Sequence, residues 1–147
     1  MKPPTLFLDV DGVLNRCGGE GLEEDKVELL RQIVAATDTT VVVSSSWHIY
    51  PQQMSRLLRL FHTIGARYGG FTPFGLTASV SGLFRAKARG AEIQEWLDAN
   101  GRPERFVLLD DDPEMGELYP YQIRTESRTG LTPEIARHVI AALQGLE

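Results

Sequence analysis

Short apolar runs alternate along the chain with longer segments whose apolar residues recur at helical spacing. The runs are rich in β-branched residues and leucine, which is typical of buried strands. They predict strands over 5–8, 40–43, 105–109 and 121–125. The longer segments predict helices over 22–37, 51–62, about 90–99 and 133–143, the last capped by Thr132. Strands that alternate with helices indicate a three-layer α/β/α sandwich with a mostly parallel, Rossmann-like sheet.

The pattern is weakest between Gly65 and Phe84. A short strand is expected near 66–68, and the remaining residues, rich in Gly, Thr, Ser and Phe, predict an irregular loop. On the second helix the pattern predicts five inward-facing residues, Met54, Leu57, Leu58, Phe61 and Ile64. The chain shows no internal repeat and no linker, so one domain over residues 1–147 is expected.

Composition narrows the class of protein. A hydrophobic content of 42% and a charged content of 24% are typical of a globular domain. The amino terminus has no apolar signal region and no window reaches membrane-spanning length, so we expect a cytoplasmic protein that does not enter a membrane. The net charge of −5 argues against a broad nucleic-acid surface but leaves room for a local basic groove. Cys17 is the single cysteine, which excludes an internal disulfide.

Polar residues follow three of the predicted strands at the point where each strand ends. Asp9 and Asp11 follow the first strand, three serines starting at Ser44 follow the second, and three aspartates starting at Asp110 follow the third. An isolated DxD pair is as often a solvated loop after a core strand. Parallel strands, however, present their carboxyl ends on one edge of the sheet, so these residues should meet in one crevice. Carboxylates gathered there need a cation to offset their repulsion.

This set of residue types suits hydrolysis of a phosphate monoester. Mg²⁺ prefers hard oxygen ligands, which carboxylates from different strands supply. In this interpretation Asp9 attacks phosphorus to form an aspartyl phosphate that water later hydrolyses, and Asp11 moves the proton in both steps. A serine hydroxyl can donate to a phosphoryl oxygen. A lysine or arginine at a helix start can offset the remaining negative charge.

Four motifs in order carry a family resemblance. DVDGVLN follows the first strand, VVVSSSW the second and FVLLDDDPEM the third, while RGAEIQEWL lies on the preceding helix. Together they look like the four signature motifs of the haloacid dehalogenase (HAD) superfamily. More narrowly, the chain resembles the small capless HAD domains of RNA-repair (Swiss Army Knife) proteins, in which TESRTGLT is also familiar. The resemblance extends from Leu6 to about Leu143.

The resemblance implies a role for each motif. Asp9 would be the nucleophile and Asp11 the general acid and base, both also at the Mg²⁺, Asp11 through its carbonyl. Asp111 would be a further metal ligand with Asp110 as its neighbour. For the phosphate-binding hydroxyl it implies Ser45, two residues before the tryptophan, with Ser44 left open. Arg89 fits the RGxEI pattern best for the cationic residue, whereas the superfamily more often has lysine, so Lys87 stays open.

The same sequence leaves less specific interpretations open. Arg85, Lys87 and Arg89 could form a solvated face, and Trp47 and Trp96 are expected to pack rather than to bind substrate. A receiver-like signalling domain is disfavoured because its acidic and lysine motifs come in another order. A non-catalytic module that binds phosphate and metal and regulates a partner is the alternative function.

Neither interval between motifs is long enough for a cap domain, because each accommodates only a helix and a loop. The expected function is therefore a Mg²⁺-dependent phosphatase with an open site. Its expected substrate is a polynucleotide end or another bulky phosphorylated group, or else a phosphorylated small molecule.

Overall fold

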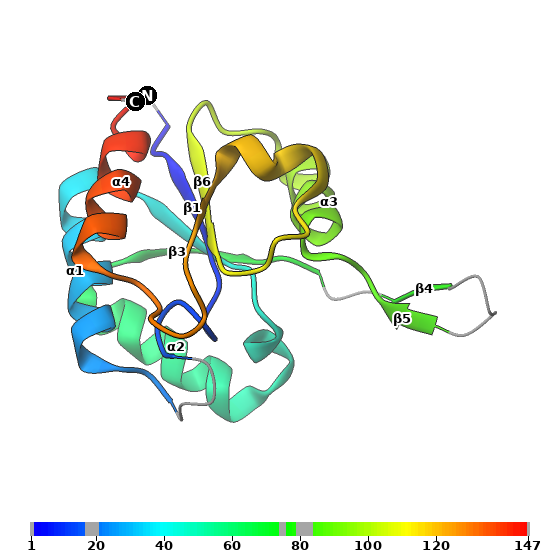
Figure 1. The fold of residues 1–147 in the computed structure, drawn as a ribbon, viewed down its shortest axis with the longest axis horizontal. Helices are drawn as coiled ribbons and strands as arrows, with labels where there is room; N and C mark the ends of the chain where they lie inside the picture. Colours follow the sequence, from blue (N-terminus) through cyan, green and yellow to red (C-terminus); the bar gives the residue numbers. More distant parts are fainter. Residues whose placement is uncertain (1, 17–20, 74–75, 79–83, 147) are drawn as a thin grey trace.

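The computed structural model describes residues 2–16, 21–73, 76–78 and 84–146. Cys17 lies outside these residues. A parallel sheet of five strands in the order β3-β2-β1-β6-β7 forms the centre of the fold (Figure 1). Its strands are β1 (Thr5–Leu8), β2 (Thr40–Val43), β3 (Arg67–Phe71), β6 (Phe106–Asp110) and β7 (Gln122–Arg124). A second, antiparallel ribbon pairs β4 (Leu76–Ala78) with β5 (Phe84–Ala86) and projects from the body on the side of α3.

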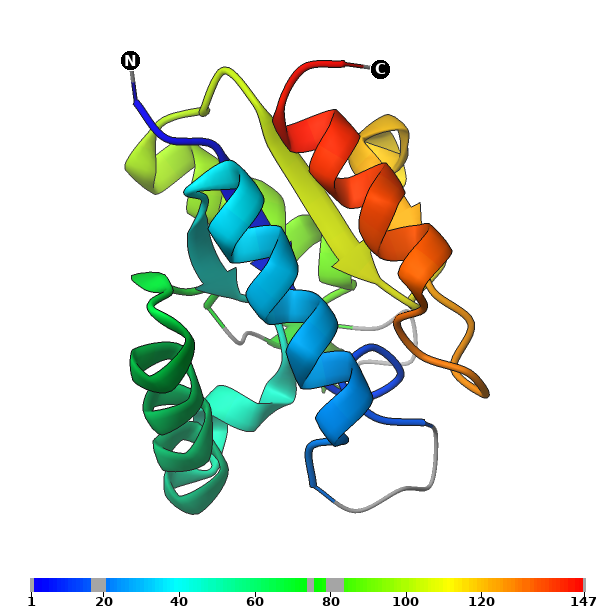
Figure 2. The same ribbon diagram turned by 90° about the vertical axis from the view of Figure 1, so that its left-hand side faces the viewer.

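Helices cover both faces of the sheet. They are α1 (Glu24–Thr37), α2 (Pro51–Ile64), α3 (Arg89–Asn100) and α4 (Pro133–Leu143), with 3-10 turns η1 (Ser46–Ile49) and η2 (Gly116–Tyr121). Helices α1 and α4 lie side by side over one face, as Figure 2 shows. Among the described residues, no helix has both the length and the apolar character needed to cross a bilayer.

Two apolar cores fill the space between these layers, because successive strand residues point to opposite faces. Leu8 and Val43 pack in the larger core with α1, α2 and α4. Phe7, Val42 and Leu108 pack in the smaller core with α3 and η2. Central strands buried on both faces explain the nearly continuous apolar runs in the sequence.

The structure confirms the expected fold class, a mostly parallel α/β/α sandwich without a separate cap among the described residues. It differs from the sequence prediction between 65 and 86, where β3 is longer than expected and β4 and β5 pair where a loop was predicted. Both strands of that ribbon are only three residues long, too short to give a periodic signal. The prediction for Leu58 was wrong, since this side chain is 41% exposed on α2.

The register of the sheet brings the ends of its central strands to one level. Leu8 stands opposite both Val43 of β2 and Leu109 of β6. The pairing continues past β1, because Ser44 N–H donates to the Leu8 carbonyl and Asp9 N–H donates to the Leu109 carbonyl. Asp9 therefore lies between Ser44 and Asp110 at the carboxyl edge of the sheet, where open α/β sheets bind ligands.

Candidate functional site

Three aspartates form an acidic cluster at this edge, Asp9, Asp110 and Asp111. Each offers one carboxylate oxygen, and these oxygens lie within 4.8 Å of one another. Asp9 is 4% exposed and Asp110 is 1% exposed, so two of the three carboxylates are almost removed from water. Oδ2 of Asp110 is buried and accepts no hydrogen bond within the described residues. A site made only of carboxylate oxygens, one of them without a hydrogen bond, fits a hard cation such as Mg²⁺.

The alternation of side chains explains why Asp9 and Asp110 meet. Phe7 and Leu108 point to the face covered by α3, so the residues two positions later, Asp9 and Asp110, also point to that face. The same rule applied to Val42 places Ser44 on the α3 face, beside Asp9. The acidic cluster thus lies at the edge where α3 begins.

Arg89, the first residue of α3, lies against the acidic cluster. Its Nη1 is 3.3 Å from Asp9 Oδ1 and 3.6 Å from Asp110 Oδ2, and it donates a hydrogen bond to the Ser44 carbonyl. The next residue, Gly90, permits this approach, since a Cβ there would stand 2.3 Å from the Met115 carbonyl oxygen. Arg89 therefore supplies positive charge to the cluster from a fixed helix terminus.

Lys87 does not join this arrangement. Its Nζ pairs with Glu95 at 2.9 Å on the partly exposed side of α3, and within the described part of the chain no ion pair links it to the three aspartates. Of the two cationic residues that the sequence left open, the structure brings Arg89 and not Lys87 to the acidic cluster.

Burial and mutual repulsion control the charge of the cluster. Burial, and next the nearby Asp110 carboxylate, hold the pKa of Asp9 well above its ordinary value, with Arg89 acting in the opposite direction. Burial also raises the pKa of Asp110 to about 6. In the absence of a cation the cluster therefore favours bound protons at mildly acidic pH.

The carboxylate of Asp11 lies outside the acidic cluster and is held separately. Asn15 Nδ2 donates to its Oδ1 over 2.9 Å, and Trp47 Nε1 donates to its Oδ2 over 3.1 Å. Asn15 also accepts the Gly12 N–H at 3.0 Å through its own Oδ1, which closes the turn after β1. The chain turns at Gly12, where the N–H groups of Val13 and Leu14 donate back to the Val10 carbonyl, so Asp11 lies at the start of this turn, beyond the end of β1.

The two serines that the sequence left open have different surroundings. Ser45 Oγ accepts the Trp47 N–H at 3.2 Å and caps η1. Ser44 Oγ is fully buried and has no hydrogen-bond partner in the described part of the chain. Ser44 is thus the hydroxyl that lies on the same face as Asp9 and is free to donate.

Gly12 allows Asp111 to approach the turn after β1. A Cβ at Gly12 would stand 2.1 Å from Asp111 Oδ2, and the residue has a φ of +84°, in the left-handed region. The DG pair in the first motif therefore serves both the turn and the acidic cluster.

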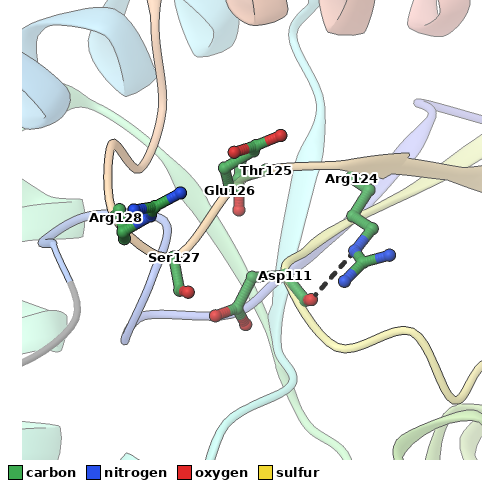
Figure 3. Close-up of a pocket in the computed structure, with 6 residues that line it drawn as sticks. All are labelled: Asp111, Arg124, Thr125, Glu126, Ser127 and Arg128. Carbon is green, nitrogen blue, oxygen red and sulfur yellow. Dashed lines mark hydrogen bonds between the residues drawn. The ribbon is translucent and has the colours of Figure 1, made fainter.

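Sequence reasoning did not identify Asn15 or the indole of Trp47 as partners of Asp11. Asn15 stands inside the DVDGVLN string, but only the folded turn shows what its amide contacts. The sequence-based prediction also missed a pocket beside Asp111, which is lined by Arg124, Thr125, Glu126, Ser127 and Arg128 (Figure 3). The TESRTGLT string had marked most of this segment without suggesting its chemistry.

Comparison with known proteins gives one family. The model of the family described as HAD domain in Swiss Army Knife RNA repair proteins matches residues 5–136. The match runs from the start of β1 into α4 and includes the acidic cluster, Arg89 and the pocket segment. Searches of curated proteins and of solved structures gave no match.

Proposed function

The chain belongs to the family of HAD domains in Swiss Army Knife RNA repair proteins, and from this premise we propose that it is a Mg²⁺-dependent phosphomonoesterase. The observation that carries the proposal is the position of Asp9, whose carboxylate lies between two other acids and Arg89. A nucleophilic carboxylate beside a cation site and a guanidinium is the arrangement that phosphoryl transfer to an aspartate requires.

Asp9, Asp110 and Asp111 would hold the Mg²⁺, together with the main-chain carbonyl of Asp11. When bound, the ion supplies positive charge that offsets the negative charge of the phosphoryl oxygens. The closeness of the three carboxylates supports this assignment, because without a cation they repel one another.

In the proposed reaction Asp9 attacks the phosphorus atom. A bond forms between a carboxylate oxygen of Asp9 and phosphorus, and the bond from phosphorus to the ester oxygen breaks. Asp11 gives its proton to the departing alkoxide, so the first product leaves as an alcohol. Asp11, now a carboxylate, takes a proton from a water molecule whose oxygen attacks phosphorus. The bond to Asp9 then breaks and inorganic phosphate is released.

Two further residues would bind the phosphoryl group. Arg89 lies 3.3 Å from Asp9 and can donate to phosphoryl oxygens as negative charge accumulates. For the hydroxyl donor we propose Ser44 over Ser45, because Ser44 has an unpaired hydroxyl and points to the face of Asp9. The sequence motif favoured Ser45, and the two choices make different predictions below.

The open surroundings of the site would leave room for a bulky substrate. No cap domain covers the carboxyl edge among the described residues, and the ribbon of β4 and β5 projects beside α3 (Figure 1). The RNA-repair proteins named in the family description act on nucleic acid, which makes a phosphorylated polynucleotide end our proposed substrate. A phosphorylated small molecule is the alternative.

Turnover of p-nitrophenyl phosphate tests this function. We expect hydrolysis in Mg²⁺, none in EDTA, and a loss of at least about a thousandfold in Asp9→Asn, since the amide cannot attack phosphorus. Asp98→Asn is the matched control, because Asp98 lies exposed on α3, where it accepts a hydrogen bond from Gln94. Full activity of Asp9→Asn would overturn the mechanism. A wild-type protein that binds Mg²⁺ and phosphate without turnover would instead be a non-catalytic module.

A further inference from the structure

A pocket opens beside Asp111, on the side of the site formed by the segment between β7 and α4. Its volume is about 420 Å³, and it is lined by Asp111 and residues 124–128 (Figure 3). Because Asp111 belongs to the acidic cluster as well, a group bound in this pocket would lie next to the proposed reaction centre.

Two arginines give the pocket its chemical character. In Figure 3, Arg124 and Arg128 flank Asp111 on opposite sides. Arg124 is fixed by its Nε–H, which donates to the main-chain carbonyl of Asp111 at 3.2 Å rather than to a carboxylate. Arg128 is exposed, and its guanidinium forms no hydrogen bond or ion pair with any described residue. Neither charge is therefore neutralised by a carboxylate in the described structure.

The carboxylates of the pocket do not cancel this charge. In the proposed site Asp111 would share its charge with Mg²⁺, which would leave Glu126 to oppose two guanidinium groups. The pocket is then positive beside a cluster that is strongly acidic, although the whole chain carries a net charge of −5. Guanidinium groups pair with phosphate through two parallel hydrogen bonds, a geometry that lysine does not offer.

The segment that carries the arginines is tied to the site at both ends. Thr125 Oγ1 donates to the Gly12 carbonyl at 2.7 Å, and Thr125 N–H donates to the Asp110 carbonyl at 3.2 Å. Beyond the turn, Leu131 N–H donates to the Val13 carbonyl at 2.8 Å. Gly130 has a φ of +67°, and a Cβ there would stand 2.5 Å from Lys26 Cε, so the segment packs closely on α1. A preformed loop loses little conformational entropy when it binds an anion.

We propose that this arginine pocket binds a second phosphate group of the substrate while the scissile phosphate lies at Asp9. The inference rests on the proposed function and narrows its substrate class to compounds that carry two neighbouring phosphates. A nucleoside bisphosphate and a phosphorylated oligonucleotide end share this chemistry. The pocket then recognises the substrate by charge on the side of β7, away from the bond that is cleaved.

Equilibrium binding tests the pocket without relying on turnover. Isothermal titration in Mg²⁺ would compare adenosine 3′-monophosphate, adenosine 3′,5′-bisphosphate and a dinucleotide with a 3′-phosphate, using Asp9→Asn to prevent hydrolysis. We expect the second phosphate to tighten binding by about tenfold or more, and the gain to shrink as salt is added. In the double variant Arg124→Gln/Arg128→Gln, the ratio of the affinity for a ligand with two phosphates to the affinity for adenosine 3′-monophosphate should fall towards one.

Arg137→Gln is the control for the substitution itself, because it removes one positive charge in the same way from an exposed position on α4, and it should keep the ratio of affinities. A gain in affinity with both the bisphosphate and the dinucleotide would support a second phosphate site in the pocket. It would also show that a free nucleotide is a sufficient ligand. A gain confined to the dinucleotide supports the pocket and assigns it to a polynucleotide end. Equal affinities for all three ligands, or a gain that the double variant keeps, would overturn the inference. Failure of wild-type protein to hydrolyse p-nitrophenyl phosphate would count against the proposed function alone.

Discussion

The indole of Trp47 holds the carboxylate of Asp11, its Nε1–H donating to Oδ2 over 3.1 Å. Trp47 is 3% exposed and also packs in the larger core, so it combines the packing role expected from the sequence with a contact to the proposed acid and base. Asn15 holds the other oxygen of Asp11. With both oxygens held, the orientation of Asp11 is set before a substrate arrives.

Trp47→Phe should therefore lower kcat without abolishing the fold. Phenylalanine keeps most of the apolar contact but removes the hydrogen bond to a charged group, which is worth about 1.5–3 kcal/mol, so we expect a loss of about tenfold or more in kcat. Steady-state kinetics with p-nitrophenyl phosphate measure this decrease in kcat. Trp96→Phe is the control, because Trp96 packs edge-on against Phe7 in the smaller core. Equal kcat in the two variants would contradict the proposed role.

Gly12→Ala should weaken Mg²⁺ binding because the new methyl group would stand 2.1 Å from Asp111 Oδ2. The side chain of Asp111 can swing away, so the main loss is a metal ligand, and we expect the Mg²⁺ concentration for half-maximal activity to rise by about tenfold or more. Gly65→Ala is a close control, since Gly65 has a left-handed backbone with a φ of +73°, and a Cβ added there would have no atom within 4 Å. Both variants should lose about 1 kcal/mol of stability from the left-handed backbone. Only Gly12→Ala should alter the response to Mg²⁺.

Arg89→Met should reduce kcat/KM by about a hundredfold or more, because it removes a preorganised cation from the place where phosphoryl charge develops. Lys87→Met removes the same charge two residues earlier but disrupts only a partly exposed pair with Glu95, worth about 1 kcal/mol or less. Kinetic comparison of the two variants decides which cation serves the reaction. A larger effect at Lys87 would reverse the assignment.

In EDTA the protein should lose stability as the pH rises from about 4 to about 7. Burial raises the pKa of Asp110 to about 6 in the folded state, above the ordinary value of 3.8. The pKa of Asp9 is raised as well. The folded state therefore binds more protons than the unfolded state in this range, so its stabilisation is complete below the ordinary pKa and is lost as pH passes the folded-state value. For Asp110 alone the loss amounts to at most about 3 kcal/mol.

Thermal unfolding with and without Mg²⁺ measures this effect. The increase in Tm caused by Mg²⁺ should be larger near pH 7.5 than near pH 4.5, because protons compete with the cation at the lower pH. Asp110→Asn in EDTA should show a flatter dependence of Tm on pH. A Mg²⁺ effect that is equal at both pH values would contradict a cation site made of these carboxylates.

Alanine substitutions of Ser44 and Ser45 should differ in their effects on KM and on the stability of the fold. Ser44→Ala removes a hydroxyl that has no partner in the described structure, so it should change stability little and raise KM for a phosphorylated substrate by about fivefold or more. Ser45→Ala removes the cap of η1 and should cost about 1 kcal/mol of stability, seen in denaturant unfolding, with a smaller effect on KM. The opposite pattern in KM would restore Ser45 as the phosphate-binding residue.

The sequence alone determined the layers of the fold and the elements of the site. The period of apolar residues separates strands from helices, and β2 begins and ends at the predicted residues. The polar residues that follow β1, β2 and β6 were also predicted to meet, because parallel strands end at one edge of a sheet. These features depend on local spacing and on a general rule of topology, both of which the sequence already contains.

Only the tertiary structure decided which side chains contact one another. The choice between Arg89 and Lys87 depends on how α3 docks against Met115, and the direction of Asp11 depends on a turn that Asn15 closes. The arginine pocket brings Arg124, the last residue of β7, and the residues that follow it next to Asp111, which follows the neighbouring strand β6. Such contacts join residues far apart in the chain through packing and register, and neither leaves a periodic signal in the sequence.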